Sequence, residues 1–339
     1  MYRSEFSVDL AALRRNCATL LRALNGAELW AVVKANGYGH GAGDAAGAAL
    51  NAGASALCVA TVPEGLVLRR EQPTARIVVM GPATSREIGQ ARDARLELVV
   101  SSDDIPPGVP VHVKLDTGMG RWGLTELTSS PSLEVVGLMS HLAAADSDAG
   151  YTEWQVERFR NVTSAYTHLT RHIANSAGAL RYPSARFDAA RCGIALYGIS
   201  PFGTDPSEDG LEPVLTWTSQ LALVKLLRAG QSTGYGREFV AERDTWIGIV
   251  PVGYADGFRR DMSGTQVRVA GEMRRVIGRV SMDALAVELD AELPVATPVV
   301  LIGRGVLIED HARVAGTIGY EIATGINSDP TRARRVVLS

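Results

Sequence analysis

Lysine and cysteine are both scarce in this chain of 339 residues. Lys and Arg together number 34, and the only lysines among them are Lys34, Lys114 and Lys225. The cysteines number 3, lie far apart, and form no Cys-x-x-Cys or Cys/His pattern with metal-ligand spacing. The sequence therefore supports neither a disulfide framework nor a structural metal site.

Long hydrophobic runs and an excess of charge are also missing. No run reaches the length of a transmembrane helix, and the first residues lack the apolar core of a signal peptide. The net charge is −3 with 46% hydrophobic and 21% charged residues, which is typical of a soluble globular protein. We expect a cytoplasmic protein that binds neither nucleic acid nor membranes.

Almost all basic residues of this chain are arginine, and the few lysines can do chemistry that a guanidinium cannot. A lysine amine can form a Schiff base or react with an electrophile, whereas arginine stays charged and unreactive. Two of the lysines end short apolar runs, Trp30-Ala-Val-Val-Lys34 and Val111-His-Val-Lys114. This pattern favours a catalytic role over chance composition.

The first 200 residues alternate short β-rich runs with helical segments. The predicted strands are Leu29–Lys34, Ala56–Ala60, Arg76–Met80, Leu96–Val100, Val111–Leu115, Val135–Ser140, Arg171–Asn175 and Asp188–Ile194. The predicted helices between them are Asp44–Ala52, Pro63–Arg70, Ser85–Ala94 and Thr152–Thr170. Eight such strands predict an α/β fold that closes as a (β/α)8 TIM barrel, with an open doubly wound sheet as the alternative.

After about residue 210 the pattern becomes that of a mostly antiparallel β domain. Six β-rich segments are separated by Gly, Asp and Pro turns, and Glu309–Gly316 is the clear helical segment. These β-rich segments are Val214–Leu227, Trp246–Pro251, Gln266–Ala270, Val276–Val280, Ala284–Leu289 and Pro298–Ile302. The stretch Pro201–Pro213 reads as a linker, so we predict domains at 1–211 and 212–339.

Reactive or hydrogen-bonding side chains follow five of the eight predicted barrel strands, where barrel enzymes place their active sites. They are Lys34, Lys114 with Arg121, His141, Asn175 with Ser176, and Arg191. The ends of strands two to four carry little chemistry, which predicts a ligand on one side of the barrel. Ser176 and Gly193 suit a phosphate site at strands seven and eight, although Gly193 fits simple barrel packing equally well.

Each of these residues also has a structural reading of its own. His141 fits a buried core histidine, and Arg191 fits an ion-pair partner. Tyr235 and Tyr254, in Gly-rich turns, fit aromatic anchors. It is their combination and order that favours a single active site.

The chain resembles the alanine racemases, which are pyridoxal-phosphate enzymes made of a barrel and a β domain. The matching segments run in family order across nearly the whole chain. They include Ala31-Val-Val-Lys-Ala-Asn-Gly-Tyr-Gly-His-Gly41, Lys114-Leu-Asp-Thr-Gly-Met-Gly-Arg-Trp-Gly123, Arg191-Cys-Gly-Ile-Ala-Leu-Tyr-Gly198, Pro251-Val-Gly-Tyr-Ala-Asp-Gly257 and Gly278-Arg-Val-Ser-Met-Asp283. The resemblance implies a racemase that interconverts L- and D-alanine for D-alanine biosynthesis.

The resemblance also implies a role for each matching residue. Lys34 would hold pyridoxal 5'-phosphate and act as one acid/base, with Tyr235 of the partner subunit in a homodimer as the other. The cofactor would be bound by Tyr38, His141, Asn175, Ser176, Arg191, Gly193, Ile194 and Tyr320. Arg121 and Met282 would bind the substrate carboxylate, Tyr254 would line the entrance, and Lys114 matches a position that is carbamylated in many relatives.

Other functions remain open at this stage. A serine or broad-specificity racemase of the same fold is the nearest alternative. A non-catalytic carrier of the cofactor would lack the β domain, and a metal-dependent barrel hydrolase would need a ligand cluster that the sequence does not have. The closing segment Gly325–Arg335 departs from the family pattern.

Overall fold

The computed structural model describes residues 2–127, 133–303 and 305–339 of the chain. The chain forms two compact units. The barrel unit comprises Ala12–Phe202 and Asp209–Glu212, and the β unit comprises Met1–Ala11, Gly203–Glu208 and Pro213–Ser339. Residues 2–11, which were predicted to belong to the barrel domain, pack with the β unit.

Eight parallel strands form the barrel sheet, in the order β8-β7-β6-β5-β4-β3-β2-β9. They are β2 (Glu28–Val32), β3 (Ala56–Val59), β4 (Ile77–Val79), β5 (Glu97–Val100), β6 (Val111–Lys114), β7 (Val135–Met139), β8 (Thr170–His172) and β9 (Ala189–Cys192). The sheet closes where Asp188 donates its amide to the carbonyl of Arg171 at 3.1 Å and Arg191 donates to Ala174 at 3.0 Å. The predicted barrel is confirmed.

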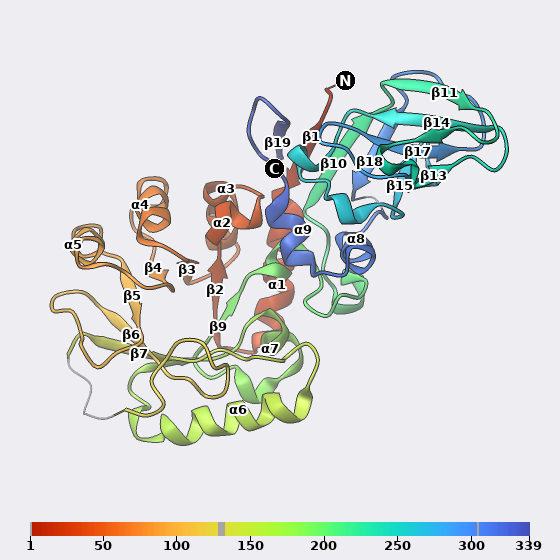
Figure 1. The fold of residues 1–339 in the computed structure, drawn as a ribbon. Helices are drawn as coiled ribbons and strands as arrows, with labels where there is room; N and C mark the ends of the chain where they lie inside the picture. The colour runs from red at the N-terminus through yellow and green to blue at the C-terminus, as the bar shows by residue number, and fades with distance from the viewer. Residues whose placement is uncertain (1, 128–132, 304) are drawn as a thin grey trace. The chain divides into compact units, whose positions relative to one another are not determined.

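One helix precedes the first barrel strand, and others connect most of the barrel strands (Figure 1). They are α1 (Leu10–Leu24), α2 (Lys34–Tyr38), α3 (Ala42–Asn51), α4 (Val62–Glu71), α5 (Ser85–Asp93), α6 (Ala149–Val162) and α7 (Ser176–Arg181). Thr61 and Thr84 each begin a helix with a capping box, in which the glutamate three residues later binds back to the threonine amide. None of the helices in the described ranges has both the length and the apolar composition that a transmembrane helix needs.

The β unit is built on a nine-stranded sheet, in the order β11-β14-β17-β16-β15-β18-β10-β1-β19. Its strands are β1 (Glu5–Asp9), β10 (Leu215–Gln220), β11 (Leu223–Leu227), β14 (Thr245–Val250), β15 (Gln266–Val269), β16 (Glu272–Ile277), β17 (Leu285–Leu289), β18 (Pro298–Ile302) and β19 (Arg334–Leu338). Among the described strand pairings of this nine-stranded sheet, only β1–β19 is parallel. The predicted mostly antiparallel domain is confirmed.

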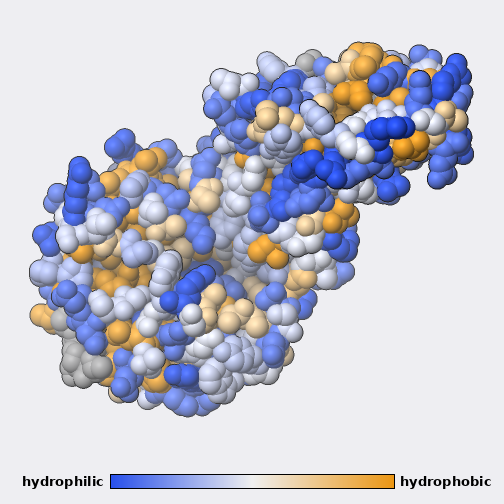
Figure 2. All heavy atoms as spheres, in the orientation of Figure 1, coloured by the Kyte–Doolittle hydropathy of each residue, from blue (hydrophilic) through white to orange (hydrophobic). Residues whose placement is uncertain are grey.

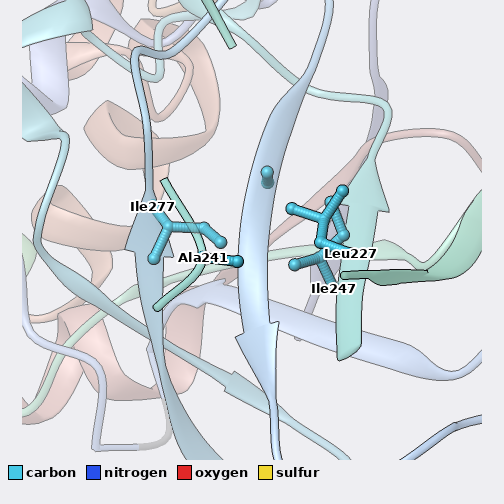
Figure 3. Packing of buried hydrophobic residues seen from close by; sticks show 5 residues of the cluster. Leu227, Ala241, Ile247 and Ile277 are labelled. Atoms are coloured by element: carbon cyan, nitrogen blue, oxygen red, sulfur yellow. The ribbon is translucent and has the colours of Figure 1, made fainter. Parts of the chain in front are cut away.

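The remaining elements of the β unit are a short hairpin and two helices. The hairpin is β12 (Ser232–Thr233) with β13 (Phe239–Val240), and the helices are α8 (Ile308–Ala315) and α9 (Gly319–Gly325). A small hydrophobic cluster packs the hairpin against the sheet, with Leu227, Ala241, Ile247 and Ile277 pointing toward one another in Figure 3. Hydrophobic side chains also gather on the viewed surface of the β unit near its β11 edge (Figure 2), where Leu223 is 48% exposed.

Candidate active site

Lys34 begins a left-handed turn directly after β2. Ala35, Asn36, Gly37 and Tyr38 have φ values of 51°, 52°, 62° and 53°, a region that L-residues avoid because of steric strain. Such strain persists only where the surroundings enforce it, and it is typical of functional sites.

Glu64 is the side chain that holds this turn in place, and the sequence analysis did not identify it. Its carboxylate accepts a hydrogen bond from the Ala35 amide at 2.8 Å and another from the Ala60 amide at 2.7 Å. The same carboxylate completes the capping box of α4. Glu64 therefore fixes the backbone next to Lys34 to the end of β3.

The Lys34 amine lies in a half-buried, cationic environment. Burial, together with the positive charges of Arg121 and Arg191, lowers the pKa of Lys34 below its ordinary value. A larger fraction of this amine is therefore neutral near pH 7 than for a solvated lysine. A neutral amine is the form that attacks an aldehyde or accepts a proton.

Tyr38, Ser176 and Gly193 come together at the ends of β8 and β9. The Ser176 hydroxyl accepts the amide hydrogen of Gly193 at 3.1 Å and that of Ala195 at 3.4 Å. The Tyr38 hydroxyl lies over Gly193, where a β-carbon would come within 2.3 Å of it. Asn175 caps α7 by accepting from the Gly178 amide at 2.9 Å. Hydroxyls and backbone amides gathered in this way suit a phosphate group. We call Tyr38, Ser176 and Gly193 the candidate phosphate cradle.

Ile194 follows Gly193 and is fully buried. It begins the short 3-10 helix Ile194–Tyr197, and the ring of Tyr197 lies 5.0 Å from that of Tyr38. The hydroxyl of Tyr197 donates to the Val32 carbonyl at 3.1 Å. This packing ties the Tyr38 ring to β2.

Arg191 is buried inside the barrel and makes hydrogen bonds with both of its terminal nitrogens. Nη1 donates to the His172 carbonyl at 3.0 Å and lies 2.7 Å from His172 Nδ1. Nη2 donates to the Ser140 carbonyl at 2.8 Å and lies 3.1 Å from His141 Nδ1. Burial lowers the pKa of Arg191 to about 10, so the guanidinium stays charged near pH 7. Burial and this charge hold the pKa of His141 well below its ordinary value.

Lys114 and Arg121 both lie against one indole ring. Lys114 Nζ and Arg121 Cζ are each 5.3 Å from the centre of the Trp122 ring, within cation–π range. Asp116 fixes the loop that carries Arg121 by accepting the amides of Gly118, Met119 and Gly120. Burial, with the charge of Arg121, lowers the pKa of Lys114 to about 8.

The other predicted site residues, Tyr235, Tyr254, Met282 and Tyr320, lie in the β unit. Tyr235 and Tyr254 line a cavity of about 1000 Å³ together with Arg259, Arg260 and Arg279. Tyr235 is 67% exposed, Tyr254 44% and Met282 52%. The backbone carbonyl of Met282 accepts the amide of Ala255 at 3.0 Å, which places Met282 beside the turn that begins at Tyr254. Tyr320 lies on α9. The pairing of Tyr235 with Lys34 stays a prediction.

The departure noted at Gly325–Arg335 has a structural counterpart in the β unit. Arg332 binds Asp256 at 3.0 Å and Asp283 at 2.7 Å. Asp256 is buried and also binds Arg3, from the opposite end of the chain. The closing segment thus holds the two turns that carry Tyr254 and Met282.

A barrel in which a lysine begins a strained turn, together with the candidate phosphate cradle and a buried arginine, is typical of a class of cofactor-dependent enzymes. The chain matches the family model of the alanine racemase N-terminal domain over residues 8–201 and that of the C-terminal domain over residues 214–336. It is 38% identical to alanine racemase 1 of Bacillus subtilis over 96% of this chain and 92% of the relative. The chain belongs to the alanine racemase family.

Solved structures of the family agree with this assignment. The alanine racemase of Streptomyces lavendulae matches with a TM-score of 0.91 and 35% identity over 100% of this chain and 98% of that one. The alanine racemase of Bartonella henselae, solved with covalently bound pyridoxal phosphate, matches with a TM-score of 0.90 and 27% identity, over 99% of each chain.

Proposed function

We propose that this protein is a racemase that uses pyridoxal 5'-phosphate to interconvert L-alanine and D-alanine. The observation that carries the proposal is the close approach of Tyr38, Ser176 and Gly193, whose hydroxyls and backbone amide suit a phosphate, in the barrel unit that also holds the Lys34 amine. A β-carbon at residue 193 would fall 2.3 Å from the Tyr38 hydroxyl, so the cradle requires glycine there. Family membership supports the same activity.

The residues present fit the cofactor group by group. Lys34 would bind its aldehyde carbon through the amine. The Tyr38 and Ser176 hydroxyls, the Gly193 and Ile194 amides, and Tyr320 from the β unit would hold its phosphate. Asn175 would fix the start of α7 below that phosphate, and His141 would pack against the ring. When bound, the cofactor accepts the electron pair left on the substrate Cα after proton removal.

Arg191 would face the nitrogen of the cofactor ring. Arginine has only donors, so a ring nitrogen opposite it must accept a hydrogen bond and stay unprotonated. Because an unprotonated ring would withdraw electrons more weakly, Arg191 in this place would disfavour transfer of the substrate proton to a carbon of the cofactor, the reaction that leads to transamination. The buried position of Arg191 suits this fixed role.

Two acid/base groups on opposite faces of Cα would move the proton. The lowered pKa of Lys34 suits a group that takes a proton near neutral pH. Tyr235 of a partner subunit would serve the other face, in a homodimer whose active sites are shared between subunits. Arg121 and the Met282 amide would hold the substrate carboxylate. Tyr254 would line the entrance, and a carbamylated Lys114 would orient Arg121 by pairing an anion with its guanidinium.

The test is to measure interconversion of the alanine enantiomers by the purified chain supplied with pyridoxal 5'-phosphate. We expect turnover by the natural sequence, none by Lys34→Ala, and unchanged turnover by Lys225→Ala, because Lys225 is exposed on β11. Racemisation by Lys34→Ala at the unsubstituted rate would refute the proposal.

A serine or broad-specificity racemase of the same fold is the competing function. Turnover of alanine should exceed that of serine and of larger amino acids, because tyrosines 235, 254 and 320 would crowd the pocket. Equal turnover across these substrates would favour the alternative. The homodimer and the cytoplasmic location stay predictions.

A further inference from the structure

The interior of the barrel contains a chain of polar side chains that leads to Arg191. It begins at Glu97, the first residue of β5, and passes through His112 on β6 and His172 at the end of β8. Both histidines are fully buried. Barrel interiors are ordinarily filled by branched apolar residues, and burying polar groups costs free energy unless every group is bonded. A polar chain in this position therefore calls for a reason beyond packing.

Hydrogen bonds link consecutive members of this chain. Glu97 Oε2 lies 2.8 Å from His112 Nε2, His112 Nδ1 lies 2.9 Å from His172 Nε2, and His172 Nδ1 lies 2.7 Å from Arg191 Nη1. Gly137 on β7 leaves room for the His112 ring, because a β-carbon at residue 137 would fall 2.1 Å from His112 Nδ1. We call Glu97, His112 and His172 the Glu–His–His relay.

The two ends of the relay fix the direction of every hydrogen bond in it. An ionised carboxylate only accepts, so His112 must carry its proton on Nε2 and accept at Nδ1. Arginine only donates, so His172 must accept at Nδ1 and donate from Nε2. Both constraints lead to the same neutral tautomer for both rings. A proton on His172 Nδ1 would place two donors 2.7 Å apart.

The charges around the relay favour this single arrangement. Burial would raise the pKa of Glu97, but hydrogen bonds from His112 and Arg76 together lower it to about 2, so the carboxylate is ionised. Arg76 binds Glu97 through two nitrogens, at 2.8 and 3.0 Å. Burial lowers the pKa of His112, and burial with the charge of Arg191 holds the pKa of His172 well below its ordinary value. Both rings stay neutral near pH 7.

The relay determines which nitrogen of Arg191 remains available. Nη1 is bound to His172, and Nη2 to Ser140 and His141. Within the ranges that the structure describes, none of the hydrogen bonds of Arg191 comes from Nε. We propose that Glu97, His112 and His172 are positioning residues that fix the Arg191 guanidinium with Nε–H left for the ring nitrogen of the cofactor. This inference rests on the proposed function.

The test combines histidine NMR with cofactor binding on the full-length protein. In protein labelled with ¹⁵N-histidine, we expect His112 and His172 each to show one neutral tautomer with the proton on Nε2, with and without pyridoxal 5'-phosphate. The signals are assigned from their loss in His112→Gln and His172→Gln. Detection of a proton on His172 Nδ1 in the unsubstituted protein would overturn the proposal.

Glu97→Gln then tests whether the direction of the relay matters. Its amide can donate as well as accept, so we expect a second His172 tautomer and a dissociation constant for pyridoxal 5'-phosphate raised by about tenfold or more. Glu212→Gln is the matched control, because Glu212 in the barrel unit is likewise bound by one arginine through two nitrogens, here Arg15 at 2.8 Å each. Its dissociation constant should stay within about twofold of the unsubstituted value.

The outcomes separate the two claims. If Glu97→Gln matched Glu212→Gln in both His172 tautomer and cofactor affinity, the positioning role would be wrong while the proposed function stood. If the unsubstituted protein bound no pyridoxal 5'-phosphate, the proposed function would fail, and with it the reason for holding Arg191.

Discussion

The hydroxyl of Tyr38 lies so close to Gly193 that a β-carbon added at residue 193 would fall 2.3 Å from it. The two residues come from opposite ends of the barrel sequence, one after β2 and the other after β9. Neighbouring strands β2 and β9 bring them together, with Trp30 opposite Arg191 in their register. The glycine is required here by the close approach of a side chain.

Replacing Gly193 with alanine should therefore weaken cofactor binding. Tyr38 would have to move out of the cradle, which should raise the dissociation constant for pyridoxal 5'-phosphate by about tenfold or more and lower stability by about 1–3 kcal/mol. Calorimetric titration and chemical denaturation measure the two effects. Gly89→Ala on α5 is the control, because nothing lies within 4 Å of its added β-carbon. It should leave binding unchanged and slightly raise stability.

Lys114 should make the stability of the cofactor-free protein depend on alkaline pH. Burial and Arg121 lower its pKa to about 8 in the folded chain, whereas the unfolded value is about 10.4. Between these two pKa values Lys114 is protonated in the unfolded chain but neutral in the folded chain. The free energy of unfolding therefore rises with pH in this range. The free energy of unfolding, relative to Lys114→Met, should increase from about pH 8 to pH 10 in buffers free of carbon dioxide. A flat difference would show that Lys114 is not held in this environment.

Tyr235→Phe should slow proton removal from one enantiomer of alanine much more than from the other. We expect exchange of the α-hydrogen of L-alanine with solvent deuterium to slow by about 100-fold or more, while exchange from D-alanine, for which we expect Lys34 to be the base, persists. Proton NMR of each enantiomer in heavy water follows both rates. Equal losses for the two enantiomers would argue against Tyr235 as the second acid/base.

We expect Asp256 to contribute strongly to the stability of the β unit. It is buried, accepts from Arg3 and Arg332, and also binds the Gly253 amide at 3.0 Å. Asp256→Asn removes the charge that these arginines share and should lower stability by about 1.5–3 kcal/mol. Asp290→Asn is the control, because Asp290 pairs with Arg274 but its side chain is 79% exposed. Urea denaturation should show a much smaller loss for the control.

The barrel strands could be predicted because each is a short run of apolar, mostly β-branched residues. All eight predicted strands match observed ones, with ends that differ by a few residues. The helix predicted over Thr152–Thr170 ends earlier, at Val162. The Thr163 hydroxyl turns back to the Phe159 carbonyl at 2.7 Å, a local competition that apolar periodicity does not reveal.

Other elements could not be predicted because their partners are distant in sequence. Strand β19 lies in an arginine-rich segment and pairs in parallel with β1, so neither strand is recognisable alone. The segment Val214–Leu227 was predicted only as β-rich, and it divides into β10 and β11 after Gln220, where Leu221 turns to pair with Thr297 and Ala296. Helix α9 was missed because its apolar face is short.

Only some residues of the candidate site could be predicted from the sequence. Lys34, Arg191 and Ser176 could be found because the ends of parallel strands meet at one face of a barrel. The Glu–His–His relay could not, since its side chains come from different strands and meet at spacings that follow no motif. Glu64 has the spacing of a capping box after Thr61, but its contact with the Ala35 amide follows no motif. A charged residue within Leu96-Glu-Leu98 and a histidine within Val111-His-Val113 were the available signals.

Reduction of the cofactor-loaded protein with borohydride tests the central claim most directly. The chain offers three lysine amines, so peptide mass spectrometry can identify the one that becomes labelled with reduced pyridoxal 5'-phosphate. The account predicts the label on Lys34, its loss in Lys34→Ala and its retention in Lys225→Arg. A label confined to Lys114 or Lys225, or no label on any lysine, would contradict it.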